Sequence, residues 1–341
     1  MNKTEYLKDL CEELIKSEKS ENYRNACIRY ASKLLDSALP VIFDLKHLSL
    51  LLGIKHADLV ALLNLDKNIL YRTKAIPKKN GGYRNILMPC LLLKYIQRWI
   101  LDNILNNINI SVVATGFRKN CSIVHNAEKH IGNECILSLD IKDFFPSICI
   151  EDIFRIFYSC GYTKEVSYTL AKLCTYDGIM PQGAPSSPAI SNIRCLNLDK
   201  RISLLCERYR ATYTRYADDI TISGNSNITK ILPVVRDIIE SEGFNVNEKK
   251  LRVALPHQRQ EITGILINSG KLTIPKKYKR ELFKEIYYCK KYGPIEHQRY
   301  IGDNHSYFKE HLYGKAYYVK MIEPDVGRDL LNKLNEIDWD Y

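Results

Sequence analysis

The chain has 341 residues, which is enough to bury a sizeable core and to form two or three subdomains. Its formal net charge of +11 at pH 7 favours a polyanionic partner. The 11 cysteines are odd in number and show no Cys-x-x-Cys spacing, so a fully paired disulfide framework is excluded and a reducing cytoplasm is expected. The charged first residues do not resemble a signal peptide, and no apolar run is long enough to cross a membrane.

The first 67 residues predict a helical region without catalytic residues. Apolar side chains recur at helical spacing from Thr4 to Lys16, with Thr4 as the expected cap, and again from Tyr23 to Leu35. Two shorter helices are expected over 45–52 and 57–63.

From Ile69 the apolar pattern changes from helical to extended. Ile69–Pro77 and Tyr83–Pro89 predict the strands of a hairpin, joined by a turn in which Asn80-Gly81 is a strong turn signal. This turn and its flank are basic, which suits either an ordinary solvated turn or a flap that grips phosphate groups. The basic residues are Lys78, Lys79 and Arg84.

A helix is expected over 91–108, and a second one follows Gly116–Ser122 and carries Asn126 and His130. A lone Asn or His in a helix is more often a structural hydrogen-bonding residue than a catalytic one, and that interpretation is kept open for His130.

Three aspartates dominate the middle of the chain. Ile136–Phe145 predicts an apolar strand that delivers Asp140 into a Phe-Phe turn, and Arg215–Ser223 predicts a strand, a tight turn with Asp218 and Asp219, and a strand. Neighbouring strand residues point to opposite faces, so only one of the adjacent pair can face a given site squarely. Converging carboxylates repel each other unless a divalent cation lies between them, although a solvated turn would also explain an Asp-Asp pair.

Between these aspartates, helices are expected over 150–159 and 163–174, followed by a shaped loop of small residues, Gly178–Asn192. Such a loop lets a base pair and its sugar approach the backbone closely. The alternative, an ordinary linker, does not explain the pair Gln182-Gly183. Pro188 suits the first turn of the helix expected over 188–206.

The last third begins with a helix expected over 228–241 and a turn, Gly243–Asn247, that places Lys250 after it. Glu261–Asn268 predicts one strand, in which Gly264 permits close backbone approach. From about Lys271 the chain is expected to be helical and basic. Between residues 271 and 320 there are 12 Lys or Arg against 5 Asp or Glu, together with nine tyrosines, a composition that suits a nucleic-acid backbone.

Taken together, residues 69–268 resemble a reverse transcriptase, because the motifs occur in the order used by that family. The motifs are Asp140 with Phe145, Pro181-Gln-Gly183, Tyr216-Ala-Asp-Asp219, and Gly243–Asn247 with Lys250. The resemblance implies an α+β right-hand polymerase, with N-terminal helices over 1–67, fingers and an RRM-like palm over 68–269, and a helical thumb over 270–341.

The resemblance also implies roles for single residues. Asp140, Asp218 and Asp219 would hold two Mg²⁺ ions that activate the primer hydroxyl and stabilise the leaving pyrophosphate. Phe145 would exclude the 2′-hydroxyl of ribonucleotides, and Lys250 would protonate the leaving group. The remaining contacts to the incoming dNTP would come from Lys78, Arg84 and Gln182.

Within the family, the chain most resembles the bacterial retron reverse transcriptases. Asn126-Ala-x-x-His130 matches their NA-x-x-H motif, and Ile262-Thr263-Gly264 stands where they carry Val-Thr-Gly. This implies a bacterial cytoplasmic enzyme whose partners are a dedicated structured RNA, its DNA product and a separate effector protein, with no membrane. The residues expected to contact nucleic acid are Asn126, His130, Thr263, Gly264, Lys276, Lys277, Lys279 and Arg280.

Two alternatives stay open at this point. One is a diversity-generating or abortive-infection type of reverse transcriptase with another partner. The other is an RNA-binding protein with a silent polymerase fold, which the three retained carboxylates disfavour. A structured non-coding RNA gene upstream of the coding sequence would favour the retron interpretation.

Overall fold

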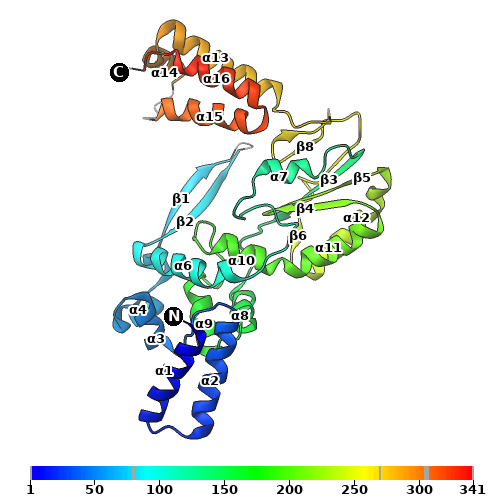
Figure 1. Cartoon of the computed structure of the whole chain (residues 1–341). Coiled ribbons are helices and arrows are strands. Elements are labelled where there is room, and N and C mark those ends of the chain that lie inside the picture. The colour runs from blue at the N-terminus through cyan, green and yellow to red at the C-terminus, as the bar shows by residue number, and fades with distance from the viewer. Residues whose placement is uncertain (1, 79–80, 269, 303–306, 340–341) are drawn as a thin grey trace. The chain divides into compact units, whose positions relative to one another are not determined.

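The computed structural model describes residues 2–78, 81–268, 270–302 and 307–339 (Figure 1). The chain divides into two compact units, each built from three chain segments. Unit 1 comprises Met1–Val112, Lys142–Lys200 and Ile239–Asn245, and unit 2 comprises Val113–Ile141, Arg201–Ile238 and Val246–Tyr341. The sequence boundaries expected near 68 and 270 stay a prediction. In the described part of the chain, no helix combines the length and the apolar character needed to span a bilayer.

Unit 1 begins with two helix pairs that confirm the predicted apolar periodicity. The helices are α1 (Lys3–Lys16), α2 (Glu21–Asp36), α3 (Leu45–Leu52) and α4 (His56–Asn64). The expected Thr4 cap is wrong by two residues, because the helix begins after Asn2, whose side chain accepts a hydrogen bond from the Thr4 backbone N–H.

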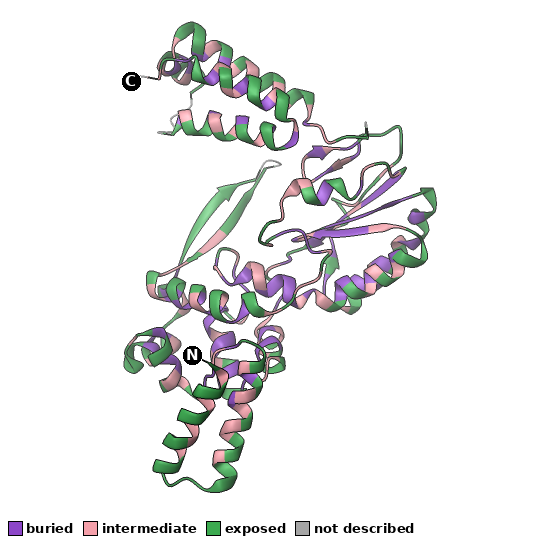
Figure 2. Ribbon diagram, viewed as in Figure 1, coloured by how far each residue is buried: buried purple, intermediate pink, exposed green. Residues whose placement is uncertain are grey.

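The basic hairpin of unit 1 is confirmed. A short helix, α5 (Lys67–Leu70), leads directly into β1 (Tyr71–Pro77), which pairs antiparallel with β2 (Tyr83–Pro89). The expected strand start at Ile69 is therefore two residues early, since that residue belongs to α5. Lys79 and Asn80 of the expected turn lie outside the described residues. Most of the hairpin is exposed to solvent (Figure 2).

The core of unit 1 lies among helices whose buried faces are apolar, including Leu93, Ile100, Ile153 and Leu170. The helix expected over 188–206 is two helices, because the backbone leaves helical geometry at Cys195. The elements are α6 (Leu91–Asn103), η1 (Leu105–Asn107), α8 (Ile150–Ser159), α9 (Lys164–Leu173), α10 (Ser187–Arg194) and the start of α11 (Leu196–Arg208).

Unit 2 is organised around a sheet with strand order β4-β5-β3-β6, in which β7 also pairs with β3. β3 lies inside the sheet and is buried along almost its whole length, which explains why its sequence is nearly continuous in apolar residues. The strands are β3 (Cys135–Lys142), β4 (Thr212–Tyr216), β5 (Asp219–Gly224), β6 (Asn245–Val246) and β7 (Arg252–Ala254).

Helices cover this sheet on both faces (Figure 1). α11 and α12 (Leu232–Ser241) run along one face, and α12 is preceded by the 3₁₀ turn η2 (Ser226–Ile231). The short helix α7 (Ile123–Glu128) lies on the other side and contacts β4. The helix expected over 228–241 is therefore confirmed over 232–241, whereas residues 228–231 belong to the 3₁₀ turn.

The single strand expected over 261–268 is wrong. The chain forms a small hairpin instead, β8 (Glu261–Ile262) and β9 (Ile265–Leu266), because Thr263 and Gly264 both adopt positive φ angles of 47° and 87°. The apolar side chains of this hairpin share one core with three C-terminal helices, α13 (Lys276–Tyr292), α15 (Phe308–Ile322) and α16 (Pro324–Asn335). The short helix α14 (Pro294–Tyr300) follows α13 in the chain.

Candidate active site

The two expected acidic strands lie side by side in unit 2. β3 pairs antiparallel with β5, and in this register Asp140 stands directly opposite Asp219. Directly opposed residues of neighbouring strands project their side chains to the same face. Tyr216 pairs with Asp219 across the turn, so Asp218 belongs to the turn itself and Asp219 begins β5. Asp219 is thus the member of the adjacent pair that shares a face with Asp140.

Asp140 is almost fully buried, and its carboxylate is held by two side chains from the segment after α12. Asn247 donates to Oδ1 over 2.9 Å, and Lys250 Nζ lies 2.6 Å from Oδ2. Partial burial works against the charge on Lys250, but the hydrogen bond with Asp140 outweighs it and raises the pKa of the lysine. Asn247 was not singled out from the sequence, where it was read only as part of a turn.

Asp219 as a whole residue is exposed to solvent, but its carboxyl group is partly desolvated and lies close to other negative charges. Desolvation, followed by the charges of Asp218 and Asp140, raises the pKa of Asp219 to about 6. Burial is the larger cause of this shift, and the two neighbouring carboxylates add to it. Hard oxygen ligands of this kind suit Mg²⁺. Within the described residues, no group of three or more His, Cys, Asp or Glu side chains is arranged as a metal site.

Asn126 and His130 are buried rather than displayed to solvent. His130 follows the end of α7, and its two ring nitrogens lie 2.6 Å from Ser223 Oγ and 2.7 Å from Thr214 Oγ1. Burial, with a smaller effect of Lys129, lowers the pKa of His130 to about 4, so the ring is neutral at pH 7. The structural interpretation kept open for His130 is therefore confirmed. Both residues are buried, and their expected contact with nucleic acid stays a prediction.

The predicted nucleotide loop of unit 1 is joined to the basic hairpin. The backbone N–H of Leu87 in β2 donates to the carbonyl of Gln182 over 2.8 Å. The next residue, Gly183, has a φ of 127°, and a Cβ there would lie 2.6 Å from Leu87 O and 2.7 Å from Ile86 Cγ2. The loop and the hairpin therefore meet only because residue 183 has no side chain.

We expect Gly183→Ala to raise the KM for dNTPs by about tenfold or more, because the new methyl group displaces the hairpin that carries the basic turn. Gly178→Ala is the matched control, since Gly178 has a positive φ of 76° but nothing within 4 Å of its would-be Cβ. Steady-state primer extension measures both variants. Equal effects of the two substitutions would mean that backbone strain, and not the contact with β2, is responsible.

The two phenylalanines after Asp140 have different environments. Phe144 is buried, and its ring lies 5.8 Å from that of Phe244, so its interpretation as core packing is confirmed. Phe145 is half-buried and meets Phe144 edge-to-face, with ring centroids 5.5 Å apart. Lys78 and Arg84 are exposed near the end of the hairpin. The roles of these residues toward a nucleotide stay predictions.

The turn Thr263-Gly264 lies at the junction between the small hairpin and the C-terminal helices. A Cβ on Gly264 would stand 3.6 Å from the hydroxyl of Tyr318 in α15, and the Tyr318 ring packs against Tyr278 of α13. Both turn residues are partly exposed. Their expected contact with nucleic acid stays a prediction.

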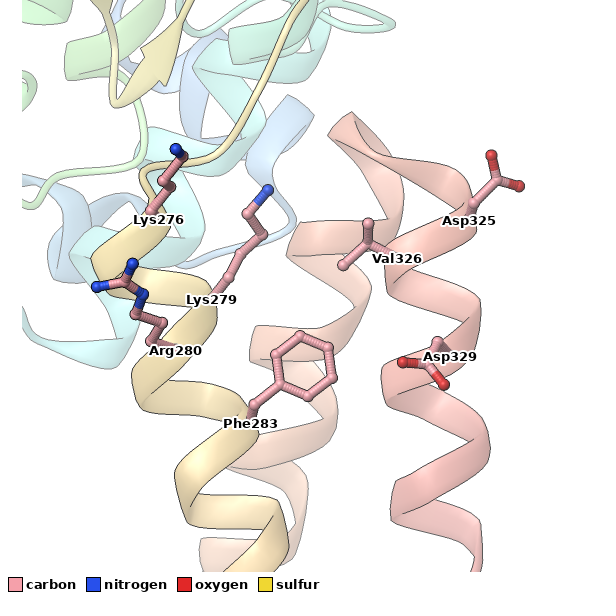
Figure 3. Close-up of a pocket in the computed structure, with 7 residues that line it drawn as sticks. All are labelled: Lys276, Lys279, Arg280, Phe283, Asp325, Val326 and Asp329. Atoms are coloured by element: carbon pink, nitrogen blue, oxygen red, sulfur yellow. The ribbon is translucent and has the colours of Figure 1, made fainter.

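The C-terminal helices carry an open groove of about 520 Å³ between α13 and α16 (Figure 3). Three of the four basic residues expected to bind RNA are exposed on α13: Lys276, Lys277 and Arg280. Lys279 differs, because its ammonium group lies 2.7 Å from Glu323, in a pair with side chains 21% and 15% exposed. Glu323 also accepts from the Ile274 backbone, so Lys279 is bound into the helical core.

We expect Lys276→Gln with Arg280→Gln to weaken RNA binding and to lower the slope of log affinity against log salt by about one unit per lost phosphate contact. Lys279→Gln is the matched control on the same helix. It should leave that slope unchanged and lower the free energy of unfolding by about 1–2 kcal/mol, because Glu323 loses its partner. Filter binding at several salt concentrations and thermal melts test this. A slope that changes as much in Lys279→Gln contradicts the assignment.

Comparisons with known proteins agree with this geometry. The family model described as "Reverse transcriptase (RNA-dependent DNA polymerase)" matches residues 76–279. The retron Ec86 reverse transcriptase of Escherichia coli is 35% identical over 311 residues, covering 88% of this chain and 96% of that protein. The retron Mx162 reverse transcriptase of Myxococcus xanthus is 33% identical over 303 residues, covering 79% of this chain and 61% of its own length.

Among solved structures, telomerase from Candida albicans in complex with a TWJ fragment of telomeric RNA matches with a TM-score of 0.46 and 11% identity. The match covers 77% of this chain and 61% of that one. It is too distant to support an argument.

The sheet with opposed aspartates and the family match define an RNA-directed DNA polymerase with the right-hand polymerase fold, a class that uses divalent metal ions. More narrowly, the chain belongs to the retron reverse transcriptases. The resemblance drawn from the order of the motifs is confirmed at both levels.

Proposed function

We propose that this enzyme copies part of a dedicated structured RNA into single-stranded DNA that stays covalently joined to that RNA. The retron family membership supports this proposal most directly. The RNA serves as template and as primer, and priming starts from an internal 2′-hydroxyl. A primer hydroxyl that is held by folded RNA needs no annealed oligonucleotide, because RNA folding prepays the entropy of positioning it.

At the active site, Asp140, Asp218 and Asp219 are the proposed ligands of two Mg²⁺ ions. The ions supply charge stabilisation at the α-phosphate and a more acidic primer hydroxyl. The opposed positions of Asp140 and Asp219 and the raised pKa of Asp219 support this donor set. Lys250 neutralises Asp140 and carries a proton that the leaving pyrophosphate can accept.

Unit 1 contributes the residues proposed to hold the incoming dNTP. Phe145 fills the space that a 2′-hydroxyl would need, and Gln182 touches the nucleotide. Lys78 and Arg84 bind the triphosphate, for which the guanidinium fork is well suited. The hydrogen bond between Leu87 and the Gln182 carbonyl supports this assignment, because it joins the hairpin and the loop into one structure.

The basic C-terminal helices are the proposed binding surface for the partner RNA, through Lys276, Lys277 and Arg280.

Retron systems of this type include a separate effector protein, and we propose that this one acts in antiphage defence. Finding a gene for a structured non-coding RNA upstream of the coding sequence would favour the retron function over the alternative of a diversity-generating or abortive-infection reverse transcriptase.

The test is to express the protein with its upstream locus and to analyse the small nucleic acids. We expect a DNA species whose mobility shifts on RNase treatment, which DNase removes, and whose 5′ end is freed by a 2′-5′ debranching enzyme. Asp218→Asn expressed with the same locus is the control and should yield no such species. A DNA product with a free 5′ end before debranching, or equal synthesis without the locus RNA, would remove the proposed function and leave reverse transcription in place.

A further inference from the structure

The turn that carries the catalytic aspartates is strained and is held by hydrogen bonds from outside the turn. Ala217 has a left-handed φ of 59°, which costs a residue with a side chain roughly 1–2 kcal/mol. Two carbonyl groups of the turn are fixed: Arg215 Nη1 donates to Ala217 O over 3.1 Å, and Ile141 N donates to Asp218 O over 3.0 Å. The position of the aspartates therefore depends on the positions of the Arg215 side chain and of the Ile141 backbone in β3.

Arg215 is itself held by Thr115, a residue that the sequence did not single out. Its side chain is fully buried, and its backbone carbonyl accepts both the N–H of Thr115 over 2.8 Å and the hydroxyl of Thr115 over 3.1 Å. The neighbouring Gly116 lies so close to the turn that a Cβ would stand 2.7 Å from Ala217 N. The backbone at Thr115 and Gly116 thus packs directly against the turn that contains Ala217.

Asn126 of α7 completes this chain of contacts. Its amide oxygen lies 2.8 Å from Thr115 Oγ1, and its amide nitrogen is buried without a hydrogen-bond partner. A hydroxyl has one hydrogen, so Thr115 donates to Asn126 or to Arg215, but not to both at once. With the amide turned by 180°, the Asn126 nitrogen donates to Thr115 and the Thr115 hydroxyl donates to Arg215, while the amide oxygen takes the buried position that the nitrogen held.

We propose that Thr115 and Asn126 are positioning residues for DNA synthesis, acting through Arg215 on the backbone of the turn that carries Asp218 and Asp219. Neither residue touches the substrate, since both are buried, at 2% and 1% exposure. Their effect is on the placement of the carboxylates, where an error of about 1 Å can cost about a hundredfold in rate.

The experiment compares Thr115→Val with Thr115→Ser, because valine keeps the shape and removes the hydroxyl, and serine restores the hydroxyl. Thr175→Val is the matched control: Thr175 is also buried, and its hydroxyl bonds to the helix carbonyl of Ala171 over 3.1 Å in unit 1. Extension of a DNA primer annealed to a plain RNA template gives kcat, the KM for dNTP and the Mg²⁺ concentration for half-maximal rate. Rates are normalised by active-site titration, so that unfolded protein does not count.

For Thr115→Val we expect kcat to fall by about tenfold and the half-maximal Mg²⁺ concentration to rise several-fold, with the KM for dNTP nearly unchanged. Thr115→Ser should restore both values, and Thr175→Val should leave both at the wild-type level. Thr115→Ala is the second variant if valine prevents folding, and it should behave as Thr115→Val.

Wild-type kcat and Mg²⁺ dependence in the folded Thr115→Val enzyme would overturn the proposal, as would a failure of serine to restore them. The same shift in Thr175→Val would overturn it as well. The plain template contains no retron RNA, so the outcome does not depend on whether the native product is branched.

Discussion

Replacing Asp218 with Asn should abolish DNA synthesis, with a loss of about a thousandfold or more, while folding and RNA binding are preserved. The substitution keeps the shape of the turn and removes one negative charge from the site proposed to bind Mg²⁺. Losing about 4 kcal/mol of charge stabilisation in the transition state corresponds to that factor. The turn itself should survive, because its carbonyl groups are held by Arg215 and Ile141 and not by the Asp218 carboxylate alone.

Primer extension with Mg²⁺ measures the loss, and thermal melts together with RNA binding measure what is retained. Asp58→Asn is the matched control, because Asp58 is exposed in the first turn of α4 and the change there removes the same charge. Extension at the wild-type rate in Asp218→Asn would refute the site assignment. A loss that parallels unfolding would assign Asp218 a structural role instead.

Replacing Phe145 with Ala or Val should lower the preference for dNTPs over ribonucleotides by about tenfold to a hundredfold. The Phe145 ring is half-buried and packs against Phe144. It is proposed to fill the space that the 2′-hydroxyl of a ribonucleotide would need. A pocket that rejects a group by size alone discriminates by about 1–3 kcal/mol, which gives that range.

Competition between dNTPs and rNTPs in single-nucleotide extension decides this prediction. Phe144→Leu is the control, because Phe144 is buried against Phe244 and its shortening should lower stability without changing selectivity. Unchanged selectivity in both Phe145 variants would leave Phe145 as a packing residue like its neighbour.

The carboxylates also illustrate what a strand pattern can predict. The sequence showed that only one of Asp218 and Asp219 can share a face with Asp140, because side chains alternate along a strand. Which of the two it is depends on the register between β3 and β5, and that register places Asp219 opposite Asp140. Strand register is set by long-range packing, so local sequence does not contain it.

Several misjudged features have a similar cause. Lys279 reads as one more basic residue on a basic helix, but Glu323, which pairs with it, is 44 residues away in the chain. The strand expected over 261–268 failed because Thr263, a residue typical of strands, adopts a positive φ beside Gly264. In both cases a distant or backbone constraint outweighs the local preference of the residue.

The sequence by itself indicated the class of enzyme, the order of its motifs and most helices, and it singled out the three aspartates now proposed to bind metal. The helices and the aspartates follow from local spacing and residue chemistry, whereas the enzyme class follows from the resemblance of the ordered motifs to a known family. The tertiary structure decided which aspartates face each other and that His130 and Asn126 are buried. It also decided that Gly183 packs closely against strand β2 of the hairpin, and that Thr115 hydrogen-bonds to Arg215 before the turn. Each of these depends on segments far apart in the chain coming within hydrogen-bonding or van der Waals distance, and only the folded chain brings them together.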